Sequence, residues 1–455
     1  MSGDLCFMSG RELAALIRTR KASAREAMAA HLDRIYRLNP TLNAIVAKLD
    51  DHQCLALADD ADRRLARGVE VGPLHGLPWA FKDLEDAVGF PCTAGSPIFK
   101  DRMPAQDSAL VARLRRAGVI PIGKTNVPEF GMGSHTYNSV YGTTVNPYDV
   151  TKSAGGSSGG AGAALAAGML PLADGSDFGG SLRNPGNFNN VVGLRPSAGL
   201  VPAAPGETEF LDLSVKGPMA RSVADTAFLL GVMAGKDLPP LERSVTGLRV
   251  AWCLDLGSLP LDRRVRSVLD AQRPTFEQLG CRVENACPDL TDADDVFLTM
   301  RSRRAWATLG PLLTTHRHQL KPEAIEEIER GARTSDAAVA DAKATHAQLI
   351  TRVRAFFEQY DFLVCAVNQV PPFDAGLHWP REIEGVTMEH YVAWMKSAYW
   401  ISATLCPAIS VPAGFTTDGL PVGAQIVGRH HDDLGVLQMA YAFEQATGYS
   451  SRRPV

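Results

Sequence analysis

The sequence predicts an α/β fold in which a mixed central β-sheet is surrounded by α-helices. Two apolar runs, Leu248–Leu254 and Cys281–Val283, flank a helical stretch, an order that is typical of a βαβ unit with parallel strands. Two further apolar runs, Ala408–Val411 and Val422–Val427, are separated by a turn-forming segment, which favours an antiparallel pair. Because both kinds of connection occur in one chain, we expect a mixed sheet.

Composition limits the classes of function. The chain has 455 residues, of which 45% are hydrophobic and 21% charged, as in ordinary globular proteins. We expect a single domain over residues 1–455, with residues 240–360 as a helix-rich elaboration within it. The net charge of -4 gives no electrostatic reason to expect binding to nucleic acid or to an anionic membrane. A small molecule is the expected partner.

The cysteines and the apolar runs bear on the compartment. The eight cysteines are scattered without a C-x-x-C pair, so we expect buried, reduced thiols and neither a disulfide framework nor a zinc site. No apolar run approaches the ~18 residues that a membrane span needs. The first residues lack the basic and apolar regions of a signal peptide. These features favour a cytoplasmic protein without a metal.

The N-terminal part is expected to begin with a helical hairpin, because Ser9 and Ser23 each start an S-x-x-E capping box ahead of a helical pattern. Further along, an apolar strand through Trp79–Phe81 is followed at once by Lys82. A lysine at a strand end lies either in water or at the edge of a pocket, and the sequence favours exposure. If Lys82 is buried instead, desolvation lowers the pKa of its ammonium and makes the amine a base near neutral pH.

The next segment contains a match to a nucleotide-binding motif. Gly118–Thr125 fits the phosphate-loop pattern G-x-x-x-x-G-K-[ST]. That motif needs a flexible loop that leads into a helix. Here Val119–Ile122 has the character of a strand, and Asn126–Pro128 does not begin a helix. We therefore interpret the match as a false positive.

Two glycine-framed serine clusters are the most informative feature of the chain. The first is Gly155–Gly160, with serine at its two central positions, and the second is Gly179–Ser181. A helix over Ala161–Met169 and a short strand over Leu170–Ala173 are predicted between them, so a flexible linker is disfavoured. Glycines beside a serine let the backbone approach a ligand and point N–H groups at a reacting atom.

Two interpretations compete with a catalytic role for both serine clusters. Residues 155–159 match G-x-S-x-G, the nucleophile elbow of α/β-hydrolases, but the preceding Asn146–Ser153 is turn-like where that motif needs a strand. A glycine loop that binds a phosphate group at the N-terminus of the following helix is physically sound. The phosphate-binding interpretation, however, assigns no role to Lys82 or Ser181.

Taken together, the two clusters resemble the sequence pattern of the amidase signature family. The resemblance rests on the first cluster, the helix after it and the D-x-G-G-S-x-R-x-P run of residues 177–185. It extends from Gly76–Asp83 through Gly193–Pro196 to Pro421–Gly428, which is most of the chain. We therefore expect the fold of that family, a mixed sheet wrapped by helices.

The resemblance also implies roles for individual residues. Ser181 would be the nucleophile, Ser157, preceded by a cis peptide bond, the bridging serine, and Lys82 the general acid and base. The chemistry agrees, because a serine must lose its proton to a base and a hydroxyl that both donates and accepts can relay it. N–H groups for the oxyanion would come from Phe178, Gly179, Gly180 and Ser181. Supporting roles fall to Ser158, Asp177 and Arg183, the last two as a pair that fixes the nucleophile loop.

The implied activity is hydrolysis of a carboxylic acid amide to an acid and ammonia or an amine, through an acyl-enzyme and without a cofactor. The strongest alternative is the glutamine-hydrolysing A-type subunit of a tRNA-dependent amidotransferase, and a phosphate-binding protein without hydrolase activity is an alternative of another class. The resemblance to this family also suggests a homodimer.

The substrate pocket is expected to be apolar. Four side chains are its candidate lining residues: Met132, Tyr137, Trp394 and Trp400. Such a pocket would favour aryl or alkyl amides, and the bulky ring of Phe178 beside the nucleophile would narrow its acyl side. The aromatic residues of 391–400 share one helical face, for which core packing is the alternative explanation.

Overall fold

A computed structural model describes residues 5–202 and 207–454. Its largest sheet has eight strands in the order β12-β11-β13-β17-β16-β9-β10-β8. Their bounds are β8 (Ala173–Asp177), β9 (Val192–Arg195), β10 (Val215–Ala220), β11 (Arg249–Trp252), β12 (Arg282–Asn285), β13 (Phe362–Ala366), β16 (Ala408–Phe415) and β17 (Pro421–Gly428). β11 is parallel to β12 and β13, whereas the other neighbours are antiparallel. The predicted mixed sheet is confirmed.

The two pairs of strands on which the prediction of a mixed sheet rested both lie in the eight-stranded sheet. β11 and β12 run parallel, and the helical stretch between them consists of α9 (Arg263–Asp270) and α10 (Arg273–Gln278). β16 and β17 form the predicted antiparallel pair. Residues 240–360 therefore supply two strands of the central sheet as well as helices.

A smaller sheet has the order β1-β3-β2. Its strands are β1 (Ile45–Val46), β2 (Pro78–Lys82) and β3 (Ile120–Thr125). The phosphate-loop match thus lies largely in a buried strand, where the Lys124 amine donates to the Glu85 carbonyl oxygen at 2.5 Å and lies 3.6 Å from Asp83 Oδ1. The segment is therefore a strand and not a loop that leads into a helix, which agrees with the interpretation of the match as a false positive.

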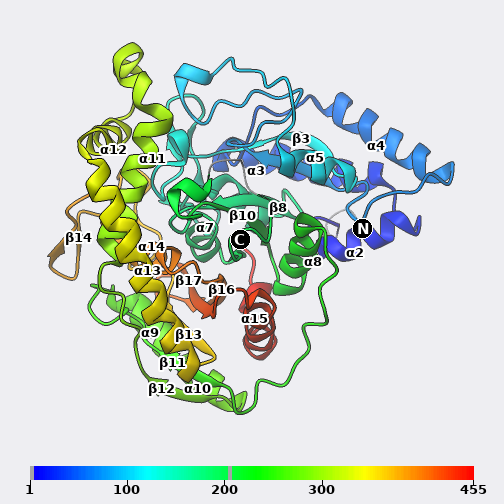
Figure 1. Cartoon of the computed structure of the whole chain (residues 1–455). Helices are drawn as coiled ribbons and strands as arrows, with labels where there is room; N and C mark the ends of the chain where they lie inside the picture. The colour runs from blue at the N-terminus through cyan, green and yellow to red at the C-terminus, as the bar shows by residue number, and fades with distance from the viewer. Residues whose placement is uncertain (1–4, 203–206, 455) are drawn as a thin grey trace.

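Helices surround the two sheets (Figure 1). The N-terminal helices and those of the middle of the chain are α2 (Gly10–Arg18), α3 (Ala24–Leu42), α4 (Asp51–Ala66), α5 (Ala109–Arg116), α6 (Gly159–Ala166), α7 (Arg183–Phe188) and α8 (Val223–Ala234). The later helices are α11 (Ala293–Thr315), α12 (Pro322–Arg333), α13 (Asp336–Gln359), α14 (Lys396–Ala403) and α15 (Asp433–Thr447). In Figure 1, α11, α12 and α13 lie on the opposite side of the molecule from α2 and α4.

Short elements complete the described structure. Three two-stranded hairpins pair β4 (Tyr137–Asn138) with β5 (Gly142–Thr143), β6 (Val145–Asn146) with β7 (Asp149–Ser153), and β14 (Glu382–Ile383) with β15 (Val386–Thr387). The 3₁₀ turns are η1 (Pro97–Phe99), η2 (Glu129–Gly131), η3 (Glu207–Phe210), η4 (Arg317–Gln319), η5 (Ala393–Met395) and η6 (Tyr449–Ser451).

Several local predictions need correction. The strand expected over Leu170–Ala173 begins only at Ala173 and continues through polar residues to Asp177. The segment before the first serine cluster contains β7 and is not merely turn-like, although that strand belongs to a separate hairpin and not to the central sheet. At the N-terminus Ser23 forms the full capping box, whereas the Ser9 hydroxyl caps α2 and donates to Asp225.

The expectation of reduced thiols is wrong for one pair of cysteines. Cys253 and Cys287 form a disulfide with a Cα–Cα distance of 5.4 Å. They follow β11 and β12, whose parallel register places Trp252 opposite Asn285 and so brings the two chain segments together. The other six cysteines are buried and free: Cys6, Cys54, Cys92, Cys281, Cys365 and Cys406.

The hydrophobic core positions the second serine cluster. One large cluster of buried side chains includes Trp79 of β2, and the other joins Phe297 of α11 to Tyr399 of α14. The two rings of that second pair stack at 4.3 Å, and a β-carbon on Gly179 would lie only 2.6 Å from the Phe297 ring. The backbone before Ser181 thus packs closely against α11 and α14.

Across residues 5–202 and 207–454, helices long and apolar enough to cross a bilayer are absent.

Candidate active site

Lys82 lies at the centre of a buried cluster of hydroxyl groups. It is the last residue of β2, and its Nζ lies 2.8 Å from the Oγ atoms of Ser157 and Ser158. Ser176 of β8 supplies a third hydroxyl, 3.0 Å from the same nitrogen. The expectation that exposure is favoured for Lys82 is wrong, because the side chain is 0% exposed and β2 is buried along its whole length.

Burial changes the acid–base behaviour of this lysine. Desolvation is the main reason that the pKa of Lys82 falls from 10.5 to about 7, and the charge of Lys216 lowers it further. The carboxylates of Glu85, Asp174 and Asp177 act in the opposite direction. Among the residues that the structure describes, the direct partners of Nζ are three hydroxyls and the Ser176 carbonyl oxygen, so none of the described carboxylates fixes the charge by contact. At neutral pH a substantial fraction of the amine is neutral and accepts a proton.

A loop of residues 134–136 holds the first serine cluster in place. A cis peptide bond joins Gly156 to Ser157, and the carbonyl oxygen of Gly156 accepts from the Ser134 hydroxyl at 2.6 Å. The Thr136 hydroxyl donates to the carbonyl of Gly155, which has a φ of +71°, a conformation that favours glycine. These bonds keep the Ser157 hydroxyl directed at Lys82.

Ser181 stands just before α7, close to the first cluster. The backbone N–H of Ser158 donates to the Ser181 carbonyl oxygen at 3.2 Å, which ties the two clusters together. Ser181 is 7% exposed, and within the described part of the chain its hydroxyl has no hydrogen-bond partner. The hydroxyl is therefore available to a ligand.

The backbone around Ser181 has several N–H groups, and one is already used. The Gly180 N–H donates to Asp177 Oδ1 at 2.7 Å, inside the loop itself. Gly180 has a φ of +117°, and a β-carbon there would lie 2.6 Å from the β-carbon of Ala398. Because Gly180 is committed to Asp177, we take Phe178, Gly179 and Ser181 as the candidate oxyanion donors.

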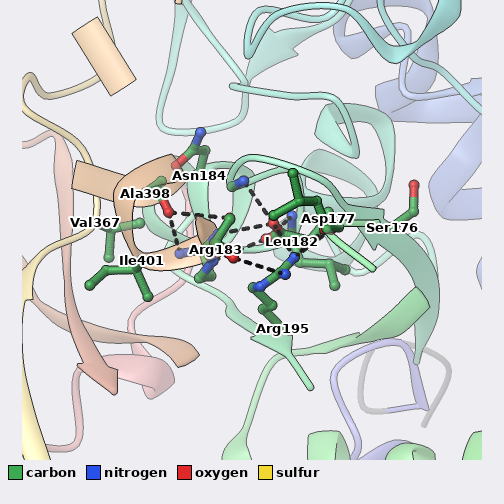
Figure 2. Close-up of polar contacts among 12 residues, drawn as sticks. Ser176, Asp177, Leu182, Arg183, Asn184, Arg195, Val367, Ala398 and Ile401 are labelled. Atoms are coloured by element: carbon green, nitrogen blue, oxygen red, sulfur yellow. Dashed lines mark hydrogen bonds and ion pairs between the residues drawn. The ribbon is translucent and has the colours of Figure 1, made fainter. Parts of the chain in front are cut away.

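Asp177 and Arg183 form the predicted pair across the nucleophile loop (Figure 2). Arg183 binds both carboxylate oxygens of Asp177, at 2.9 and 3.0 Å, and Arg195 donates to the Asp177 carbonyl oxygen at 2.7 Å. Burial alone raises the pKa of Asp177, but the charges of the two arginines and the Gly180 N–H more than offset it and hold the pKa well below its ordinary value. The aspartate stays ionised.

The same arginine joins the nucleophile loop to distant parts of the fold. Arg183 also donates to the Ala398 carbonyl of α14 at 2.8 Å and to Gln425 Oε1 of β17 at 2.6 Å. Figure 2 shows this network between Asp177, Arg183, Arg195 and Ala398. Its role is structural, because it fixes the backbone on both sides of Ser181.

We expect Arg183→Met to destabilise the protein by about 3–5 kcal/mol, because it leaves the buried Asp177 carboxylate with one charged partner fewer. The free energy of unfolding in urea measures this change. Arg263→Met is the matched control, since its side chain is 83% exposed and its ion pair with Glu384 is worth about 0–1 kcal/mol. Equal stabilities of the two variants would contradict the role given to Arg183.

Two polar residues of β8 belong to the site and were not identified from the sequence. Ser176 contacts the Lys82 amine, and Asp174 accepts from Trp79 Nε1 at 2.8 Å and from the Lys82 N–H at 3.2 Å. Burial raises the pKa of Asp174 to about 6, and the charge of Glu85 adds to the effect. The spacing of two between them places both on one face of a strand, a signal that was missed because the predicted strand ended at Ala173.

The four candidate pocket residues do not share one environment. Met132 lies in the loop after η2 and Tyr137 begins β4; both face α12, where the Tyr137 hydroxyl donates to Glu323 at 3.1 Å. Trp394 is 1% exposed and stacks on Phe188, which favours core packing for that ring. Trp400 is half-buried and donates through Nε1 to Asp294 at 3.1 Å. Phe178 is half-buried beside the nucleophile loop and packs on Phe297 at 5.4 Å between ring centroids.

The structure also bears on a phosphate or metal at this site. The Gly160 N–H donates to the Asn126 carbonyl and the Ser158 N–H to the Ser181 carbonyl, so the N-terminus of α6 uses these donors within the protein. That arrangement disfavours a phosphate at the helix end. Among the residues that the structure describes, histidine, cysteine, aspartate and glutamate side chains form no group of three or more that could hold a metal ion.

The fold and the site together define a class of protein. It is an α/β protein in which a buried lysine contacts serine hydroxyls, and a further serine that follows two glycines lies close by. The protein-family model named Amidase matches residues 26–437. The chain belongs to the amidase signature family.

Relatives of known name cover almost the whole chain. An acylamidase of Rhodococcus erythropolis is 36% identical, over 99% of this chain and 98% of the relative. The A-type subunit of the glutamyl-tRNA(Gln) amidotransferase of a Cyanothece species is 34% identical, over 98% of this chain and 99% of the relative. The crystal structure of a bacterial aryl acylamidase of the amidase signature family superposes with a TM-score of 0.90 at 26% identity, covering 99% of both chains. The family and its fold, as predicted, are confirmed.

Proposed function

We propose that this protein hydrolyses carboxylic acid amides to a carboxylic acid and ammonia or an amine, through an acyl-enzyme on Ser181. The observation that carries the proposal is the buried amine of Lys82, which lies 2.8 Å from the Ser157 hydroxyl and has a pKa lowered to about 7 by desolvation. A neutral amine in contact with a serine hydroxyl is a base that can act at neutral pH.

In the first step Ser157 relays a proton. The Ser181 oxygen attacks the amide carbonyl carbon while its proton passes to the Ser157 oxygen, and the Ser157 proton passes to the neutral Lys82 amine. The carbonyl oxygen becomes an oxyanion, which the N–H groups of Phe178, Gly179 and Ser181 would stabilise. Lys82 is then an ammonium ion.

In the second step the same proton returns. Lys82 donates through Ser157 to the nitrogen of the tetrahedral intermediate, the carbon–nitrogen bond breaks, and the amine or ammonia leaves as a neutral molecule. Water then attacks the ester of Ser181, with neutral Lys82 again accepting a proton through Ser157. The bond between the acyl carbon and the Ser181 oxygen then breaks, and Lys82 returns the proton through Ser157 to that oxygen. The products are the free acid and the restored Ser181 hydroxyl.

The comparisons support amide chemistry and leave two substrate classes. The acylamidase relative favours a free hydrolase of acyl amides, and the amidotransferase relative favours glutamine hydrolysis within a partner complex. The half-buried ring of Phe178 beside the nucleophile loop supports substrates with an aryl or alkyl group, which such a ring binds better than a small polar group.

A panel of amides tests the proposal. The purified chain is incubated with acylated anilines, small aliphatic amides and glutamine, and the release of amine or ammonia is measured. Turnover of anilides without any partner protein supports the free hydrolase. Release of ammonia from glutamine, with no turnover of the other amides, supports the amidotransferase role. Binding of a nucleotide without amide turnover supports the phosphate-binding alternative, and equal turnover of anilides and small polar amides contradicts the aryl or alkyl preference.

A further inference from the structure

A second lysine, Lys321, is half-buried and reaches the loop that faces Ser157. Lys321 precedes α12, and its Nζ donates to the Met132 carbonyl oxygen at 2.6 Å. Its backbone N–H donates to Glu129 Oε2 at 2.9 Å. The start of α12 is thus attached by two hydrogen bonds to residues 129–132, a segment more than 180 positions away in the chain.

Residues in and just after this segment lie beside the bridging serine and bind the peptide bond before it. A β-carbon on Gly131 would lie 3.4 Å from Ser157 Oγ, which is van der Waals contact, so the backbone there runs directly beside that hydroxyl. Two residues after Met132, the Ser134 hydroxyl binds the carbonyl of the cis peptide before Ser157 at 2.6 Å. Movement of the Met132 carbonyl therefore changes the position of the groups that orient Ser157.

We propose that Lys321 is a positioning residue, whose ammonium holds the Met132 carbonyl and so keeps residues 129–134 against Ser157. The inference rests on the proposed role of Ser157 as proton relay. A relay needs two hydrogen bonds aligned at one hydroxyl, and a displacement of about 1 Å in such a site costs about 10²-fold in rate.

Charged groups face Lys321 from each neighbouring element. Glu129 of η2 and Glu323 of α12 favour its charged form, whereas Arg301 of α11 disfavours it. The ring of Tyr137 lies 5.3 Å from Nζ, and His378 contacts Glu323 at 3.0 Å. Burial is the largest effect and lowers the pKa of Lys321 to about 8, so the amine is charged at pH 7 and loses its charge above pH 8.

The test compares Lys321→Met with Lys321→Arg. Methionine removes the donor, so we expect kcat to fall about 10- to 100-fold, the usual effect of losing a charged hydrogen bond, with a smaller change in KM. Arginine keeps the charge at all relevant pH values and should restore most of the activity. In the wild type the rate should fall above pH 8, because a neutral amine binds a carbonyl about half as strongly as an ammonium. Neither variant should show this alkaline decline.

Two further measurements keep the test independent of the substrate and of folding. The rate at which phenylmethanesulfonyl fluoride labels Ser181, followed by mass spectrometry, reports the relay even if none of the amides is turned over. Thermal unfolding of each variant reports folding, and Lys343→Met, at an exposed lysine of α13, is the matched control.

Slower labelling in Lys321→Met, with rescue by arginine and loss of the alkaline decline, supports the inference. Unchanged labelling and an unchanged pH profile in Lys321→Met overturn it. A loss that follows the folded fraction, with the wild-type pH profile in the remaining enzyme, also overturns it. Absence of amide turnover in the wild type is a separate result, which counts against the proposed function alone.

Discussion

Ser181→Ala is expected to lower kcat for amide hydrolysis by about 10⁶-fold, the scale seen when the nucleophile of a serine hydrolase is removed. The variant has no oxygen that can form the acyl-enzyme, while substrate binding and the oxyanion N–H groups are unchanged. Residual activity above that of water is expected for this reason. Amine release from the best substrate of the panel measures the effect.

The control for this prediction is Ser258→Ala, at an exposed serine far from Lys82 in the sequence, which should retain full activity. Ser181→Ala should fold normally, because a buried hydroxyl without a partner contributes little to stability. Denaturation of the intact protein before proteolysis and mass spectrometry should trap an acyl group on residue 181 of the wild type only. Substantial turnover by Ser181→Ala would exclude the proposed mechanism.

Lys82→Met is expected to lower kcat by about 10⁴-fold or more, because nucleophile and base act as one unit. Methionine is apolar and nearly isosteric with the lysine stem, so the buried position remains filled. The wild-type value of kcat/KM should rise tenfold per pH unit below pH 7 and level off between pH 7 and pH 8, because only the neutral amine accepts the proton and the pKa of Lys82 is lowered to about 7. The residual activity of Lys82→Met should lack this acidic limb.

Stability provides a second readout for the same residue. The pKa of Lys82 falls from 10.5 in a solvated lysine to about 7 in the fold, so between these values the unfolded chain binds more protons than the folded one. This group therefore makes folding more favourable as the pH rises from 7 to 10.5. Lys82→Met should remove that contribution, whereas Lys343→Met should leave it in place. An acidic limb that persists in Lys82→Met would assign the titration to another group.

Some features of the site could be predicted from local sequence alone. Glycines on both sides of the Ser157–Ser158 pair and before Ser181 indicate backbone that must approach other groups closely, and Asp177 with Arg183 indicates a pair that spans the proposed nucleophile. Each of these signals depends on residues a few positions apart. The structure confirms the pairing and the tight packing around Gly179 and Gly180.

Other features depended on contacts between distant segments. The sequence favoured an exposed Lys82, yet the fold buries it against residues 75 and 94 positions away, Ser157 and Ser176. The disulfide between Cys253 and Cys287 follows from the parallel register of two strands, which scattered cysteines do not reveal. The attachment of Lys321 to Met132 likewise joins segments that carry no shared pattern.

The sequence by itself therefore determined the family, the mixed sheet and the residue types around the proposed nucleophile, because periodicity and short motifs are local properties of the chain. Only the tertiary structure decided that Lys82 is buried with a pKa lowered to about 7 and that the Gly180 N–H binds Asp177. The reason is physical: a pKa depends on the loss of water and on charges within a few ångströms, and the chain brings those charges together only when it folds.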